Sequence, residues 1–139
     1  MSVFEQPERV RNELIALLFK LVRSDHSIDQ KEWAYILQVA DSLGLKEEDV
    51  HEILSNKESY ILHPPKSERE RMTILYYLLF LMKIDGRIGQ REKDLIREYG
   101  FKLGFRTSMT DEMILLIQDH AQKKFDPEML LDKIRKYSN

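Results

Sequence analysis

The chain contains no cysteine, few glycines and prolines, and no long hydrophobic run. The lack of cysteine excludes disulfides, zinc-thiolate centres and a cysteine nucleophile. The longest unbroken apolar run, Ile74 to Met82, is much shorter than the roughly 18 to 20 residues that a membrane-spanning helix needs. The first residues also lack the basic start and apolar stretch of a secretory signal. We therefore expect a cytoplasmic protein that does not span a membrane, and peripheral membrane association stays open.

No excess of one charge is present either. The 139 residues include 22 Lys and Arg against 24 Asp and Glu, a net charge of -2. Because binding to phosphate backbones needs clustered basic residues, we expect no nucleic-acid partner. Apolar residues make up 42% and charged residues 33%, which is typical of a folded globular chain. The length predicts a single domain over residues 1–139.

Helix signals run from end to end, whereas alternating strand patterns are scarce. Val10, Leu14, Leu18 and Leu21 have helical spacing, and Asp29 stands three residues before Glu32, the spacing of a capping box. The sequence predicts an all-α fold, a single compact bundle of about seven helices. Their expected spans are about 8–24, 29–43, 47–54, 67–84, 90–103, 111–123 and 126–137, with Ser108 or Thr110 capping the sixth.

An internal repeat is the most informative pattern. A shift of sixty residues aligns the two halves without a gap and pairs identical residues, namely Leu18 with Leu78, Asp25 with Asp85, Ile28 with Ile88, Gln30 with Gln90, Glu32 with Glu92, Ile36 with Ile96 and Leu43-Gly44 with Leu103-Gly104. The repeat halves cover about 8–56 and 67–118, and the linker 57–66 contains two prolines that interrupt any helix. Two copies predict one closed domain with an internal pseudo-twofold repeat.

Each half carries a turn of the form D-x-x-I-x-x-x-E, which is similar to the second half of an EF-hand calcium loop. The positions that should supply the preceding oxygen ligands are Leu21 and Arg23 in the first copy and Leu81 and Lys83 in the second. Apolar and cationic side chains cannot replace carboxylates around a hard dication. We therefore do not expect an EF-hand calcium site.

Two roles remain for the acidic residues of these turns. In the favoured structural role, Asp25 and Asp85 accept backbone hydrogen bonds, Ile28 and Ile88 enter the core, and the glutamates cap the next helices. In the alternative, the two turns form an acidic patch that holds a divalent cation or a basic partner. Its candidate metal ligands are Asp25, Asp29, Glu32, Asp85 and Glu92. Neighbouring basic residues such as Lys31 and Arg91 weaken that patch, and no other cofactor is expected.

The same residues carry a family resemblance. The second half has Asp85-Gly86-Arg87-Ile88, then Glu92 and Leu103-Gly104-Phe105, and the first half has Asp25, Ile28, Glu32 and Leu43-Gly44-Leu45. In this pattern, from about residue 10 to 118, the chain resembles the tellurite-resistance TerB-like family. The resemblance implies a bundle of about seven helices, a bacterial origin and a link to stress responses. It attaches no catalytic residue to the motif.

No catalytic constellation stands out in the sequence. No serine lies in a G-x-S-x-G context, no glycine-rich phosphate loop is present, and the four histidines lack metal-ligand spacing. We expect a non-enzymatic protein-interaction or scaffold module of a bacterial stress response, a monomer or homodimer with an unidentified protein partner. Phe101, Phe105 and Met109, beside Arg106, are candidates for a partner surface. The alternative is a divalent-cation-binding protein that uses the two Asp/Glu turns.

Overall fold

The structure, a computed structural model, describes residues 7–22, 28–84 and 89–119. Within these ranges the protein is all-α, as the sequence predicts, with six α-helices where about seven were expected. The helices are α1 (Pro7–Leu21), α2 (Gln30–Ser42), α3 (Glu47–Ser55), α4 (Glu68–Ile84), α5 (Gln90–Lys102) and α6 (Thr107–Asp119), with a short 3-10 helix η1 (Lys57–Ser59) between α3 and α4. The predicted helix 126–137 lies outside the described residues.

The helix bounds repeat with the predicted offset. Helix α5 begins and ends sixty residues after α2, and α6 begins sixty residues after α3. Equivalent sequence patterns therefore fold into equivalent local structure in the two halves.

The chain divides into two compact units, Met1–Pro65 (the first unit) and Lys66–Asn139 (the second unit). The boundary falls inside the predicted linker 57–66, which also contains η1. The closure of both halves into one domain about a pseudo-twofold axis stays a prediction.

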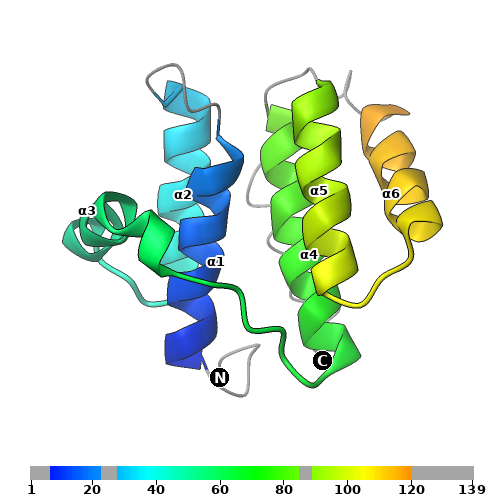
Figure 1. The fold of residues 1–139 in the computed structure, drawn as a ribbon. Helices are drawn as coiled ribbons and strands as arrows, with labels where there is room; N and C mark the ends of the chain where they lie inside the picture. Colours follow the sequence, from blue (N-terminus) through cyan, green and yellow to red (C-terminus); the bar gives the residue numbers. More distant parts are fainter. Residues whose placement is uncertain (1–6, 23–27, 85–88, 120–139) are drawn as a thin grey trace. The chain divides into compact units, whose positions relative to one another are not determined.

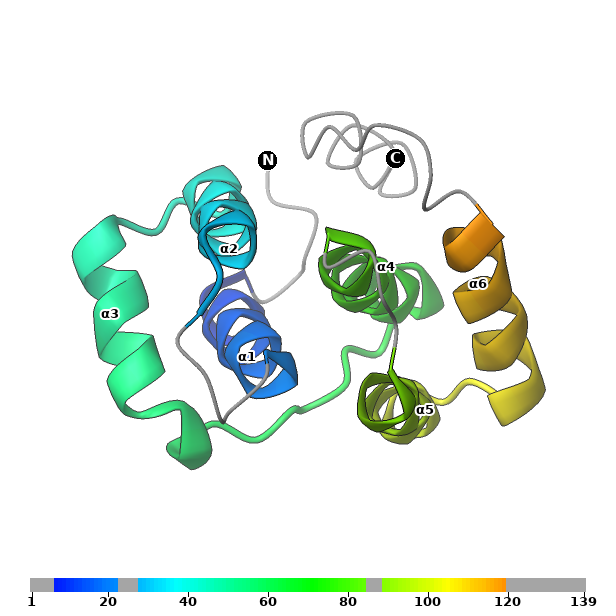
Figure 2. The same ribbon diagram turned by 90° about the horizontal axis from the view of Figure 1, so that it is seen from above.

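In the first unit, α1 and α2 form a helical hairpin and α3 packs against both (Figures 1 and 2). Helix α1 is buried on every side from Glu13 to Phe19 because its apolar residues are nearly continuous. The largest fully buried side chains of this unit are Leu14, Ile15, Leu18, Phe19, Tyr35 and Ile36. Burial of each large apolar side chain contributes about 1.5 to 3 kcal/mol. Ile28, predicted to enter the core, is half-buried.

The second unit repeats this arrangement with α4 and α5 as the hairpin and α6 packed against both (Figure 2). The stretch from Ile74 to Met82 is buried except for Tyr76, which is half-buried. The fully buried large residues of this unit are Ile74, Leu75, Leu78, Leu79, Ile96 and Leu103. The apolar run Ile74–Met82 is therefore the core of this unit.

Glycine ends the second helix of each unit in the same way. Gly44 has φ +83° and Gly104 has φ +91°, a left-handed conformation that side chains with a Cβ disfavour. The N–H of Leu45 donates to the Ala40 carbonyl at 2.9 Å, and the N–H of Phe105 donates to the Gly100 carbonyl at the same distance. These six-to-one bonds are those of a Schellman motif. The end of α2 agrees with the predicted span 29–43, and the same turn recurs at Gly104.

Helix α6 begins earlier than the sequence predicts. It starts at Thr107, whereas the expected start was near Asp111 with Ser108 or Thr110 as the cap. Thr110 lies inside the helix, where its buried hydroxyl donates to the Arg106 carbonyl at 3.3 Å. A threonine hydroxyl can cap a helix or donate a hydrogen bond to a carbonyl of the preceding helical turn. Thr110 donates to the preceding turn and is not the cap.

No helix among the described residues is long and apolar enough to cross a lipid bilayer. The segment Ile74–Met82 is instead part of the buried core of its unit.

Candidate functional site

The structure describes three of the five acidic candidates. Asp29 and Glu32 lie at the start of α2, and Glu92 lies in the first turn of α5. Asp25 and Asp85, which would complete the two turns, lie outside the described residues. The patch proposed from all five residues therefore stays a prediction.

Asp29 and Glu32 form the capping box that their spacing predicts. Asp29 precedes α2 with extended backbone angles, φ -61° and ψ 147°, and its Oδ1 accepts a hydrogen bond from the Lys31 N–H at 2.8 Å. In return, Oε1 of Glu32 accepts from the Asp29 N–H at 3.3 Å. Each bond satisfies a backbone N–H that the helix itself leaves without a partner. The two carboxylates thus hold the helix start.

The first turn of α5 keeps the glutamate but has no capping side chain. Gly89 stands where α2 has Asp29, and it provides no side-chain hydrogen bond. A Cβ at Gly89 would lie 2.8 Å from Oε2 of Glu92, so the glutamate folds back over the position that a side chain would fill. A side chain at this position would require the Glu92 carboxylate, the far end of a flexible side chain, to move aside, as Glu32 leaves room for Asp29 at the start of α2.

Glu32 and Glu92 are buried to the same extent, each 6% exposed. Burial of a carboxylate requires hydrogen bonds or opposite charge, because desolvation of an unpaired ion is costly. Among the residues that the structure describes, no group of three or more carboxylates and histidines is arranged to hold a metal ion. The two glutamates occupy equivalent positions, each in the first turn of the second helix of its unit.

A second polar cluster, which sequence reasoning missed, ties the linker to α1. Buried Glu13 accepts from the His63 backbone N–H at 2.7 Å, and its Oε2 lies 3.0 Å from His63 Nδ1. Arg9 approaches Glu13 at 3.2 Å and also donates to the His63 carbonyl at 2.8 Å. The only signal in the sequence is a glutamate inside the apolar stripe of α1, and spacing does not reveal a partner fifty residues away.

The described histidines, His51 and His63, are exposed. His51 is 5.2 Å from the Trp33 ring, which in turn lies 5.8 Å from Phe19, so three aromatic rings connect α1, α2 and α3. His63 makes the contacts with Glu13 given above. His26 and His120 lie outside the described residues.

The candidate partner surface is only partly exposed. Phe101, near the end of α5, is 74% exposed, whereas Phe105 is buried and Met109 is half-buried. Phe105 is drawn inward because it follows Gly104 in the Schellman turn, where this position packs against the helix that it ends. Of the three predicted residues, Phe101 alone presents a largely exposed ring.

An ion pair joins α5 to α6 in the second unit. Nε of Arg97 lies 2.6 Å from Oδ1 of Asp111, and this hydrogen bond raises the pKa of the Arg97 guanidinium above its ordinary value. Asp94 lies on the same side of Arg97 at 3.4 Å. The pair lies between α5 and the edge of α6 that carries Asp111.

A comparison with known protein families matches part of the chain. Residues 2–55 match a family model described as "Tellurite resistance protein TerB". This range comprises α1, α2 and α3, the helices of the first unit. No curated protein and no solved structure matches the chain significantly.

Proposed function

Because this chain is TerB-like over residues 2–55, we propose that it is a non-enzymatic protein-interaction module of a bacterial stress response, of the tellurite-resistance type. The observation that carries the proposal is the exposure of Phe101. Its equivalent in the first unit, sixty residues earlier, is Asp41, which is also exposed. Aromatic side chains are enriched at protein interfaces relative to the rest of the surface, and this ring is exposed where a partner can reach it.

The surroundings of Phe101 suit a protein partner. Lys102, the next residue, and Arg106, beyond the turn at Gly104, are both exposed, and Lys102 Nζ lies 3.7 Å from Oε1 of the exposed Glu98. An aromatic side chain surrounded by charged residues is typical of a small contact site with an apolar centre and a polar rim. The partner that fits is a protein with an apolar pocket and acidic residues at its edge.

Affinity capture with the full chain tests this proposal. The tagged protein and its Phe101→Asp variant, which carries the residue of the first unit, are compared in lysate of the source organism grown with and without tellurite. Asp41→Asn is the matched control. We expect a defined protein to be retained by the wild type and the control and lost from Phe101→Asp. Retention of the same proteins by all three would contradict the proposal.

The alternative is a divalent-cation-binding protein that uses the two Asp/Glu turns, and the recurrence of a glutamate at the equivalent positions Glu32 and Glu92 supports it. A cation that binds only the folded state stabilises it and therefore raises Tm. At a cation concentration one hundred times Kd, the free energy of unfolding increases by about 2.7 kcal/mol. Thermal unfolding with calcium, magnesium, manganese or zinc, repeated with Glu32→Gln and Glu92→Gln, separates the two functions. A cation-dependent rise in Tm that both variants lose would favour cation binding. The interaction module predicts no such rise.

A further inference from the structure

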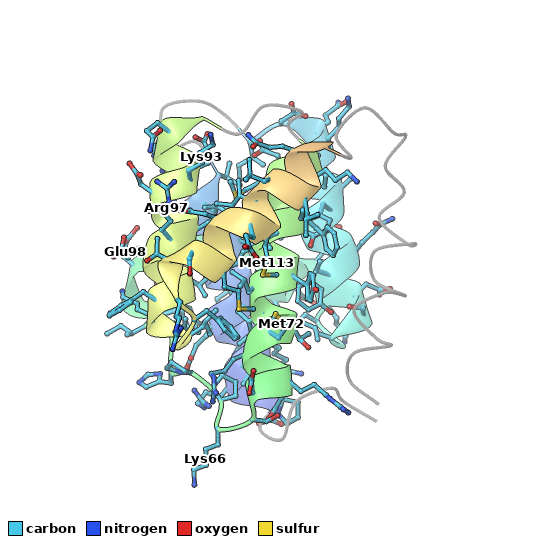
Figure 3. All side chains as sticks on the ribbon, turned by 90° about the vertical axis from the view of Figure 1, so that its right-hand side faces the viewer. Lys66, Met72, Lys93, Arg97, Glu98 and Met113 are labelled. Atoms are coloured by element: carbon cyan, nitrogen blue, oxygen red, sulfur yellow. The ribbon has the colours of Figure 1, made fainter. Side chains whose placement is uncertain are left out.

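An apolar strip runs along one side of the second unit and consists of Met72 and Tyr76 of α4 and Met113 and Leu116 of α6. Leu116 is 60% exposed, and Met72 and Met113 are half-buried. Met113 and Leu116 are three residues apart on α6 and therefore share a face. Figure 3 shows Met113 and Met72 on the same side of the unit, and α4 and α6 are in contact.

The first unit presents no such strip at the equivalent positions. Sixty residues earlier, the polar residues Asn12 and Asn56 stand for Met72 and Leu116, and the apolar residues Ala16 and Ile53, which stand for Tyr76 and Met113, are buried. The side of α1 that corresponds to the apolar strip of the second unit is covered by the segment that follows α3. Lys20 Nζ donates to the Tyr60 carbonyl at 2.6 Å, and Glu13 accepts from the His63 N–H at 2.7 Å.

The two hydrogen bonds that hold the segment after α3 against α1 have no equivalent on α4. Thr73 stands for Glu13, and its buried hydroxyl donates to the Arg69 carbonyl of its own helix at 2.8 Å. Phe80 stands for Lys20, and its ring stacks with Tyr76 at 5.9 Å. A chain segment that packs on the equivalent side of α4 must therefore be held by apolar contacts.

The chain after α6 carries an apolar pattern that suits this strip. Pro127, Leu130, Leu131 and Ile134 follow the i, i+3, i+4, i+7 spacing of an amphipathic helix, and Asp126 is a suitable N-cap. We propose that residues 126–137 form an amphipathic helix that folds back antiparallel to α6 and covers the strip of Met72, Tyr76, Met113 and Leu116.

Reach and charge favour this occupant over a second copy of the chain. Six residues separate α6 from position 126, a usual length for a helix–helix connection, and they span up to about 20 Å. Helix α6 bears Asp111, Glu112 and Asp119 and no basic residue. Residues 120–139 contain five basic residues, Lys123, Lys124, Lys133, Arg135 and Lys136, against three acidic ones. Contact between two α6 helices would instead bring acidic residues together.

The lack of cysteine makes a disulfide test direct, because every introduced pair is the only one in the chain. Leu116→Cys is combined with Leu130→Cys in the full chain. The matched control combines Leu115→Cys with Leu130→Cys. Leu115 is equally exposed, at 59%, and equally near the connection, but it lies on the edge of α6 that carries Asp111 and faces Arg97 of α5.

We expect the cysteines at 116 and 130 to form a disulfide within one chain. Their effective concentration, measured by equilibration with glutathione at low protein concentration, should be at least about tenfold higher than that of the cysteines at 115 and 130. Equal closure of both pairs would mean that the connection alone brings the thiols together, and would overturn the proposal. Disulfides between chains would assign the strip to a second copy, with the same consequence.

A second pair of variants tests the apolar contact itself. Leu131→Asp with Ile134→Asp should abolish the preference for position 116, whereas Asp132→Asn with Lys133→Gln, on the other face of the proposed helix, should retain it. Circular dichroism checks that the rest of the protein stays helical in each case. A preference for position 116 that survives Leu131→Asp with Ile134→Asp would contradict the proposal.

Discussion

The carboxylate of Glu13 in α1 accepts a hydrogen bond from the backbone N–H of His63, 2.7 Å away and fifty residues later in the sequence. Arg9 completes the cluster, because it approaches Glu13 and donates to the His63 carbonyl. The carboxylate is buried, so these contacts replace the water that it loses on folding. They hold the linker against the first helix.

Glu13→Ala should therefore lower the free energy of unfolding by about 1 to 3 kcal/mol, since it removes the acceptor of a buried hydrogen bond and the partner of Arg9. Urea denaturation of the full chain measures the change. Asp41→Ala, at an exposed position of α2, is the control and should stay within about 0.5 kcal/mol of the wild type. Equal midpoints for the two variants would show that the cluster does not stabilise the fold.

Gly100 and Thr110 mark a close approach of α5 and α6. A Cβ at Gly100 would lie 2.7 Å from Thr110 Oγ1, and Thr110 is fully buried. We expect Gly100→Ala to destabilise the protein, because overpacking of about 1 to 3 kcal/mol outweighs the gain of about 1 kcal/mol in helix propensity.

In a Thr110→Ala background, the same substitution should be neutral or stabilising because the obstructing side chain is gone. A double-mutant cycle from urea denaturation measures this coupling. Additive effects of the two substitutions would contradict the steric explanation.

Gly44 and Gly104 allow a clean comparison of the two units. Both have positive φ, and a Cβ would meet no neighbouring atom within 4 Å at Gly44 and one side-chain atom at 3.9 Å at Gly104. Alanine at either position should cost about 1 to 2 kcal/mol, because only the backbone conformation opposes it. Asparagine, which tolerates the left-handed region better, should cost less. Thermal and chemical denaturation would both have to show similar losses for the two glycines, and a loss at one position alone would argue against equivalent turns.

Asp29→Ala should lower stability by about 1 kcal/mol through loss of the hydrogen bond from the Lys31 N–H. Asp29→Ser should retain most of the stability because serine also caps helices. Hydrogen exchange of the first turn of α2 provides a local measurement. Faster exchange in Asp29→Ala than in Asp29→Ser is the expected result, and equal exchange would show that the backbone does not need this cap.

The fold class and helix bounds could be predicted because their causes are local. Apolar spacing, the Asp29–Glu32 box and Gly44 act within one or two helical turns, and the repeat doubled each signal. The predicted helix start near Asp111 was wrong because Thr110 matched the residue type of a cap, while its buried place against Gly100 depends on a neighbouring helix.

The candidate site was predicted less completely. Sequence spacing identified Asp29 and Glu32 as a cap, and the structure shows the two hydrogen bonds. Phe101 and Phe105 looked alike in the sequence, yet one is exposed and the other buried. Periodicity does not separate them, since the Schellman turn at Gly104 changes the direction of the chain between them.

By itself, the sequence determined that this protein is helical, repeated and turned at fixed glycines, because backbone preferences and apolar periodicity act over short distances along the chain. Only the tertiary structure decided that Glu13 meets His63, that Gly100 leaves room for Thr110 and that Phe101 faces solvent. Those relationships join residues far apart in sequence or on opposite sides of a turn, and their energies arise only once the helices pack.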